Sequence, residues 1–249
     1  MSNVRSLLLE SVALTDRGLV RNHNEDTVFE NAELGLAVLA DGMGGYNAGE
    51  VASRLAVDIV VQGFKEAIKT SGDNFRNGTL NVQNGLMDVT LYLREQIVNA
   101  NRIVYESALN EPECEGMGTT IVAAALSVQR IAIAHVGDSR AYRWRGKQLL
   151  QLTRDHSLLQ EQIDNDEWKE EYADEFPRKN LVTRALGVER FIQVDIAEFE
   201  IMPGDVFLMC SDGLTDMLAT KHIANTLEHM ARDPLTEIAT HLVKGANQK

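Results

Sequence analysis

Short apolar runs, partly β-branched, recur along the chain and predict β-strands. Three pairs of runs are separated by only a few residues, which include Gln129 and Arg130, Gly146, and Pro203 with Gly204. Because parallel strands need long crossovers, such short connections predict that the two members of each pair lie antiparallel. The predicted strands are residues 34–40, 119–128 with 131–136, 141–144 with 149–152, and 192–201 with 206–210.

Apolar residues at helical spacing predict two long helices, over residues 50–68 and 86–109. The stretch between them, residues 70–84, is rich in Ser, Gly, Asn and Asp and is typical of a loop. Residues 221–249 predict two further helices, divided near Pro234. The polar segment 160–179 is expected to form a surface excursion.

Helices placed around antiparallel strands predict an α+β fold in one domain over residues 1–249. Hydrophobic residues make up 44% and charged residues 24%, as in ordinary soluble proteins. We find no membrane-spanning run and no signal peptide, and the two cysteines favour a reducing cytoplasm. The net charge of −13 argues against nucleic acid as a partner.

Three predicted strands lead into an aspartate beside a glycine. Asp41 opens the segment DGMGG, Asp138 follows Gly137, and Asp212 precedes Gly213. Each alone is explained by an ordinary turn. Brought together, the three carboxylates could not all ionise without cations between them, so they predict a site for hard divalent ions.

A fourth polar segment, residues 21–26, joins an arginine to two carboxylates. Arg21 could bind a phosphate dianion through two hydrogen bonds, and Glu25 or Asp26 could order water on a metal. Taken by itself, this segment is more typical of a solvated charged loop than of a binding site.

Together these segments resemble the metal-dependent serine/threonine protein phosphatases (the PPM or type 2C family), in the order and spacing of the bacterial branch. The resemblance covers nearly the whole chain. It rests on RNHNED at 21–26, ADGMGG at 40–45, GMGTT at 116–120, HVGDSRAYRWR at 135–145, LTRDHS at 152–157, LVTRALG at 181–187 and CSDGLTD at 210–216. The fold it implies is two central antiparallel β-sheets flanked by antiparallel helix pairs, an α-β-β-α sandwich, with a flap around residues 157–185.

The resemblance also implies roles for individual residues around two Mn²⁺ or Mg²⁺ ions and a third, weaker ion. The implied reaction is in-line attack on phosphorus by a metal-activated hydroxide, without a phospho-enzyme. Asp41 would bridge the two main ions, the Gly42 carbonyl would bind one of them, and Asp212 would bind the first. Glu25 and Asp26 would act at the second ion mainly through water. Asp138 and Asp212 would hold the third ion, and Arg21 would bind the substrate phosphate.

Two departures from the family pattern bear on activity. Met43 stands where eukaryotic relatives carry a histidine proposed as general acid, and a thioether cannot donate a proton. The family's C-terminal Asp-Asn turn and its last strand are absent from this sequence, so either the sequence is a truncated form or the protein lacks that ligand and strand. The missing aspartate leaves open an alternative function, a non-enzymatic regulatory module with an incomplete metal site.

Other interpretations are weaker. No EF-hand-like loop supports a plain Ca²⁺-binding domain, and no basic phosphate loop follows Cys210 to support a thiol phosphatase. His23, His135 and His156 are expected to be structural. We therefore predict a monomeric phosphatase that acts on phosphorylated proteins, a Ser/Thr kinase among them, and has no nucleic-acid or membrane partner.

Overall fold

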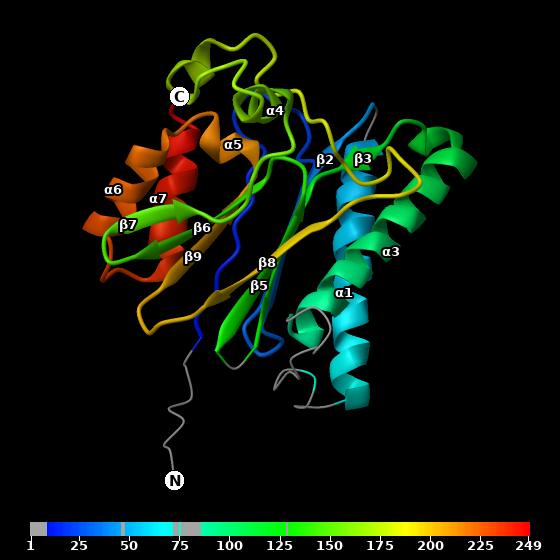
Figure 1. Ribbon diagram of the computed structural model, residues 1–249, viewed down its shortest axis with the longest axis horizontal. Coiled ribbons are helices and arrows are strands. Elements are labelled where there is room, and N and C mark those ends of the chain that lie inside the picture. The colour runs from blue at the N-terminus through cyan, green and yellow to red at the C-terminus, as the bar shows by residue number, and fades with distance from the viewer. Residues whose placement is uncertain (1–8, 46–47, 72–74, 76–85, 128) are drawn as a thin grey trace.

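The computed structural model describes residues 9–45, 48–71, 75, 86–127 and 129–249. In these ranges two antiparallel sheets lie face to face, with a pair of helices against the outer face of each (Figure 1). The predicted α+β sandwich is therefore confirmed.

The larger sheet contains six of the described strands, in the order β1-β2-β4-β5-β8 with β3 paired to β2. The smaller sheet has the order β7-β6-β9. The bounds in the larger sheet are β1 Asp26–Asn31, β2 Leu36–Met43, β3 Gly118–Thr119, β4 Ile121–Leu126, β5 Arg130–Val136 and β8 Asp195–Glu200; those in the smaller are β6 Arg140–Arg145, β7 Gln148–Gln151 and β9 Val206–Cys210.

Two of the three predicted hairpins form, β4 with β5 and β6 with β7. The third, between β8 and β9, is wrong. β8 pairs with β5 in one sheet, whereas β9 pairs with β6 in the other. The turn at Pro203 and Gly204 therefore carries the chain from one sheet to the other. Strand β9 joins the smaller sheet because its Phe207 and Met209 pack into the layer between the two sheets. Strand β1 was not predicted.

Helices α1 (Ala48–Ser71) and α3 (Asp88–Asn110) cover the larger sheet. Their apolar faces meet alternate residues of β4 and β5, such as Ile121 and Ala134, while the residues between these, such as Val122 and Ile133, face the smaller sheet. Both faces of β4 and β5 are thus buried, which explains their nearly continuous apolar sequences. The predicted loop 70–84 falls mainly outside the described residues, although Thr70 and Ser71 belong to α1.

The smaller sheet is covered by α6 (Thr220–His229) and α7 (Leu235–Ala246), which confirms the helix pair predicted around Pro234. A separate apolar cluster joins Trp144 of β6 to Ile223, Leu227 and Leu242 of these helices. The short helix α5 (Asp212–Thr215) connects β9 to this layer.

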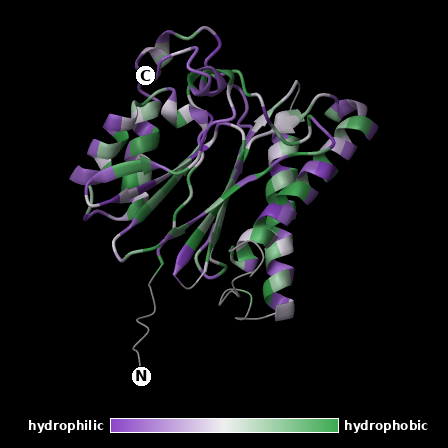
Figure 2. Ribbon diagram, in the orientation of Figure 1, coloured by the Kyte–Doolittle hydropathy of each residue, from purple (hydrophilic) through white to green (hydrophobic). Residues whose placement is uncertain are grey.

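The predicted surface excursion leaves and rejoins the body at one place, where Ser157 and Val182 form an isolated β-bridge. It contains α4 (Leu158–Asp164) and the 3₁₀ segment η2 (Glu170–Glu175), and Figure 2 shows it as mainly hydrophilic. No helix within the described ranges combines the length and apolar character needed to cross a bilayer.

Candidate metal centre

The three predicted aspartates come from three strands that end at the same edge of the sandwich, uppermost in Figure 1. Asp138 follows the end of β5 after Gly137, and Asp212 is the first residue of α5 after β9. Asp41 was predicted to follow its strand, but β2 continues through Asp41 to Met43, because Gly42 and Met43 pair with β3. The carboxylate is therefore held by a strand and not by a free turn.

Asp41 lies at the middle of the carboxylate group. Its side chain is in hydrogen-bonding contact with that of Asp26, its partner across the β1–β2 ladder, and with that of Asp212. Ser211 donates a hydrogen bond to Asp26 Oδ2 at 2.8 Å. Asp138 lies close enough to Asp41 and Asp212 for charge repulsion to act on all three.

Burial and mutual repulsion disfavour ionisation of these carboxyl groups. Burial, followed by the charges of Asp26 and Asp212, raises the pKa of Asp41 to about 9. Burial and the charge of Asp212 raise the pKa of Asp138 to about 7. Burial also raises the pKa values of Asp26 and Asp212.

Gly42, the residue after Asp41, packs closely against the backbone at the start of α1. A Cβ atom on Gly42 would lie 2.0 Å from the carbonyl oxygen of Gly49, and one on Gly49 would lie 2.6 Å from Glu25 Oε1. The Gly42 amide donates to the Glu25 carbonyl at 3.1 Å. Gly42 of the DGMGG segment and Gly49 of α1 are therefore needed for this close packing, a constraint that sequence reasoning did not identify.

Arg21 and Glu25 form an ion pair beside the aspartates. Their Nη1 and Oε2 atoms are 3.8 Å apart, and the Arg21 side chain is 73% exposed. Its charge favours ionisation of both Asp26 and Asp212, so the guanidinium lies near the carboxylate group. A weakly held and exposed guanidinium can reorient towards an anion at small cost.

Buried hydroxyl groups that sequence reasoning left without a role hold the backbone of Asp41. Thr119 Oγ1 donates to the Asp41 carbonyl at 2.8 Å, and the Asp41 amide donates to Thr120 Oγ1 at 3.2 Å. Thr120 in turn meets the Ser139 hydroxyl at 2.8 Å. Thr119 and Thr120 belong to the GMGTT motif, and Ser139 belongs to HVGDSR. These two motifs were the sequence signal from which a role for the three hydroxyl groups could have been inferred.

The donor set fits hard divalent ions. Four partly buried carboxyl groups lie close together, so their negative charges must be neutralised by protons or by cations. Carboxylate oxygens are ligands that suit Mg²⁺ and Mn²⁺. His135, His156 and Asp195 form a tighter group, because one potential ligand atom from each lies within 4.8 Å of those of the other two. That group is rich in hydrogen-bond donors, including Arg184, which do not suit a cation.

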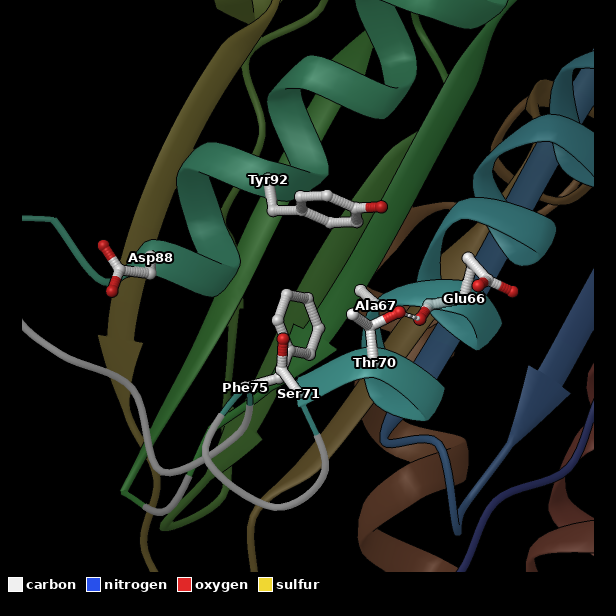
Figure 3. A pocket seen from close by; sticks show the side chains of 7 residues that line it. All are labelled: Glu66, Ala67, Thr70, Ser71, Phe75, Asp88 and Tyr92. Carbon is white, nitrogen blue, oxygen red and sulfur yellow. Dashed lines mark hydrogen bonds between the residues drawn. The ribbon is translucent and has the colours of Figure 1, made fainter.

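A separate pocket of about 420 Å³ lies near the end of α1 (Figure 3). Its lining runs from Glu66 to Ser71 on that helix and includes Phe75, Asp88 and Tyr92. The carboxylates of Glu66 and Asp88 would repel a phosphate group. α1 begins at Ala48 beside the aspartates, so this pocket lies at its opposite end and is not a phosphate site.

Comparison with known proteins gives consistent matches. The model of the protein phosphatase 2C family matches residues 19–244. The serine/threonine phosphatase stp of Listeria welshimeri is 38% identical over 238 residues, which span 94% of this chain and 88% of that protein.

Two solved structures are also similar. The serine/threonine phosphatase of S. agalactiae has a TM-score of 0.80 at 33% identity, covering 94% of this chain and 91% of that one. The catalytic domain of the serine/threonine protein phosphatase PstP, in complex with two manganese ions, has a TM-score of 0.75 at 33% identity and covers 94% and 89%. The chain therefore belongs to the protein phosphatase 2C family and is a bacterial serine/threonine protein phosphatase.

Proposed function

We propose that this protein hydrolyses phosphoserine and phosphothreonine in proteins at a site formed by Asp41, Asp138, Asp212 and the segment 21–26, with Mn²⁺ or Mg²⁺ as its ions. The observation that carries the proposal is the contact of Asp41 with both Asp26 and Asp212 under partial burial. Such a group is costly for a metal-free protein and is expected where cations are bound.

In this proposal the aspartates divide the work by position. Asp41, between Asp26 and Asp212, would bridge the two main ions, the Gly42 carbonyl would bind one of them, and Asp212 would complete the first. Glu25 and Asp26 would orient water at the second ion, and Asp138 with Asp212 would hold a weaker third ion. When bound, the ions lower the pKa of a water molecule and neutralise charge on the transferred phosphoryl group.

Arg21 would bind the substrate phosphate. Its exposed guanidinium pairs with Glu25 at the long distance of 3.8 Å, so it can turn to form two hydrogen bonds to phosphate oxygens. Met43 cannot act as a general acid, so the leaving alkoxide would take its proton from solvent. The enzyme would oppose a bacterial serine/threonine kinase, since such a kinase must supply the phosphorylated substrates. A cytoplasmic, monomeric enzyme stays a prediction.

The test compares Asp41→Asn with Asp58→Asn, an exposed aspartate on α1, in hydrolysis of a phosphothreonine peptide with Mn²⁺. Loss of the bridging charge should lower kcat/KM roughly 10²- to 10³-fold, and Asp58→Asn should match the wild type. Thermal melts must show that both variants fold. Near-normal turnover by Asp41→Asn would refute the site, and a folded wild type that binds Mn²⁺ without turnover would favour the regulatory-module alternative.

A further inference from the structure

His156 lies outside the carboxylate group but contacts the loop that carries Asp138. Its ring is 8% exposed and stacks on the ring of His135, with centroids 4.8 Å apart and planes inclined by 13°. His135 Nε2 is 2.8 Å from the carbonyl oxygen of Arg154, which orients the stack. The two rings are thus held rigidly beneath the end of β5.

The proton positions on His156 follow from its neighbours. The Gly137 amide, a fixed donor, points at His156 Nδ1 at 3.0 Å, so Nδ1 must carry a lone pair. A neutral ring then bears its proton on Nε2, which faces Asp195 Oδ2 at 3.4 Å. Burial, His135 and Arg184 lower the pKa of His156 to about 4, which agrees with a neutral ring at pH 7.

This proton arrangement argues against a metal at His135, His156 and Asp195. Nδ1 of His156 is occupied by the Gly137 amide, and its Nε2 carries the proton, so the ring has no lone pair left for an ion. Arg184 Nη1 donates to Asp195 Oδ1 at 3.1 Å and so supplies beside this carboxylate the positive charge that a cation would. Its 2.9 Å approach to Nε2 is not a hydrogen bond in this tautomer, because a guanidinium and a protonated Nε2 are both donors.

The residues on either side of Asp138 are each anchored. Gly137 is bonded twice to His156, since its carbonyl also accepts from the His156 amide at 2.9 Å. Gly137 packs so tightly that a Cβ atom there would lie 2.6 Å from Thr120. Ser139 meets the Thr120 hydroxyl, and Arg140 forms a bidentate pair with Asp155. Asp138 is therefore held between fixed neighbours.

We propose that His156 is a positioning residue for the phosphatase reaction, which aims Asp138 at the metal centre through the hydrogen bond from the Gly137 amide to Nδ1. The inference rests on the proposed role of Asp138 in binding the weaker third ion. Without an acceptor at Nδ1 the buried Gly137 amide loses its partner, and the loop must shift to satisfy it. A shift of a fraction of an ångström at Asp138 is enough to weaken an ion that demands regular geometry.

Two nearly isosteric variants separate this role from simple packing. Asn places its Oδ1 where Nδ1 stands and can accept from Gly137, whereas Gln extends towards Arg184 and leaves the Gly137 amide without an acceptor. We expect His156→Gln to weaken the weakest Mn²⁺ site in calorimetry and to lower kcat, each roughly tenfold, with KM unchanged. His156→Asn should stay within about twofold of the wild type in both. Thermal melts establish that each variant folds.

The tautomer can be read directly. A long-range ¹H–¹⁵N spectrum of the wild-type imidazole should show a proton on Nε2 of His156 and none on Nδ1, and this holds whether or not the enzyme turns over. A protonated Nδ1, or equal behaviour of the Asn and Gln variants, would overturn the inference. A wild type without Mn²⁺-dependent hydrolysis would instead overturn the proposed function, so the two failures are distinguishable.

Discussion

Gly42→Ala tests whether the contact between β2 and α1 positions Asp41. The added Cβ would lie 2.0 Å from the Gly49 carbonyl oxygen, 2.4 Å from its carbon and 2.8 Å from the Glu25 carbonyl oxygen. All three are backbone atoms, so no flexible side chain can move aside. The matched control is Gly45→Ala in the same segment, because a Cβ on Gly45 meets no atom of the described residues within 4 Å.

The structure gives the expected magnitude. Ordinary contact begins at 3.4 Å, so the strand and the helix must separate by about 1.4 Å at this point. Overpacking of this kind costs about 3 kcal/mol at the upper end of its usual range. For a chain of this size, that loss lowers Tm by roughly 6–12 °C. A displacement near 1 Å beside Asp41 should also reduce kcat about 10²-fold.

Calorimetric melts and Mn²⁺-dependent peptide hydrolysis on both variants decide the matter. Gly45→Ala should stay within about 0.5 kcal/mol of wild-type stability and within twofold of its activity. Equal behaviour of the two variants would show that the close approach is not a constraint. A destabilised Gly42→Ala with normal kcat would show that this packing does not position Asp41.

Two further predictions concern charge. Arg21→Ala should raise KM and lower kcat/KM roughly tenfold in peptide hydrolysis while leaving Mn²⁺ affinity in calorimetry unchanged; the reverse pattern would give Arg21 a structural role. Glu198→Gln should cost about 2 kcal/mol in urea unfolding at pH 7, because Glu198 accepts from the Met87 amide at 2.6 Å and from Arg130 at 2.9 Å. Burial opposes ionisation of Glu198, yet the bonds from Thr90, Met87 and Arg130 hold its pKa below the ordinary 4.5. Its contribution is thus present above about pH 4.5 and is lost as the pH falls through the folded-state pKa, so the destabilisation by Glu198→Gln should shrink as the pH is lowered below 4.5. A destabilisation independent of pH, or equal to that of the exposed control Glu200→Gln, would contradict this reasoning.

Pairing between strands was only partly readable from sequence. The β4–β5 and β6–β7 connections are hairpins, as their short turns predict, but the equally short turn at Pro203 and Gly204 is not. A short turn limits the distance between the end of one strand and the start of the next, but it does not determine which strands pair. Packing of Phe207 and Met209 between the sheets made that choice for β9. Strand β1 was not predicted because its sequence, DTVFEN, has only two apolar residues and no apolar run.

The sequence by itself determined where most helices and strands lie, and that Asp41, Asp138 and Asp212 each stand at or beside the end of an apolar strand. These features depend on local periodicity and on single residues, so they can be read along the chain. Only the tertiary structure decided that Asp41 contacts both Asp26 and Asp212, that Gly42 meets Gly49, and that His156 holds Gly137. Each of these contacts joins segments distant in sequence, and their geometry follows from how two sheets and a helix pack, which no local pattern encodes.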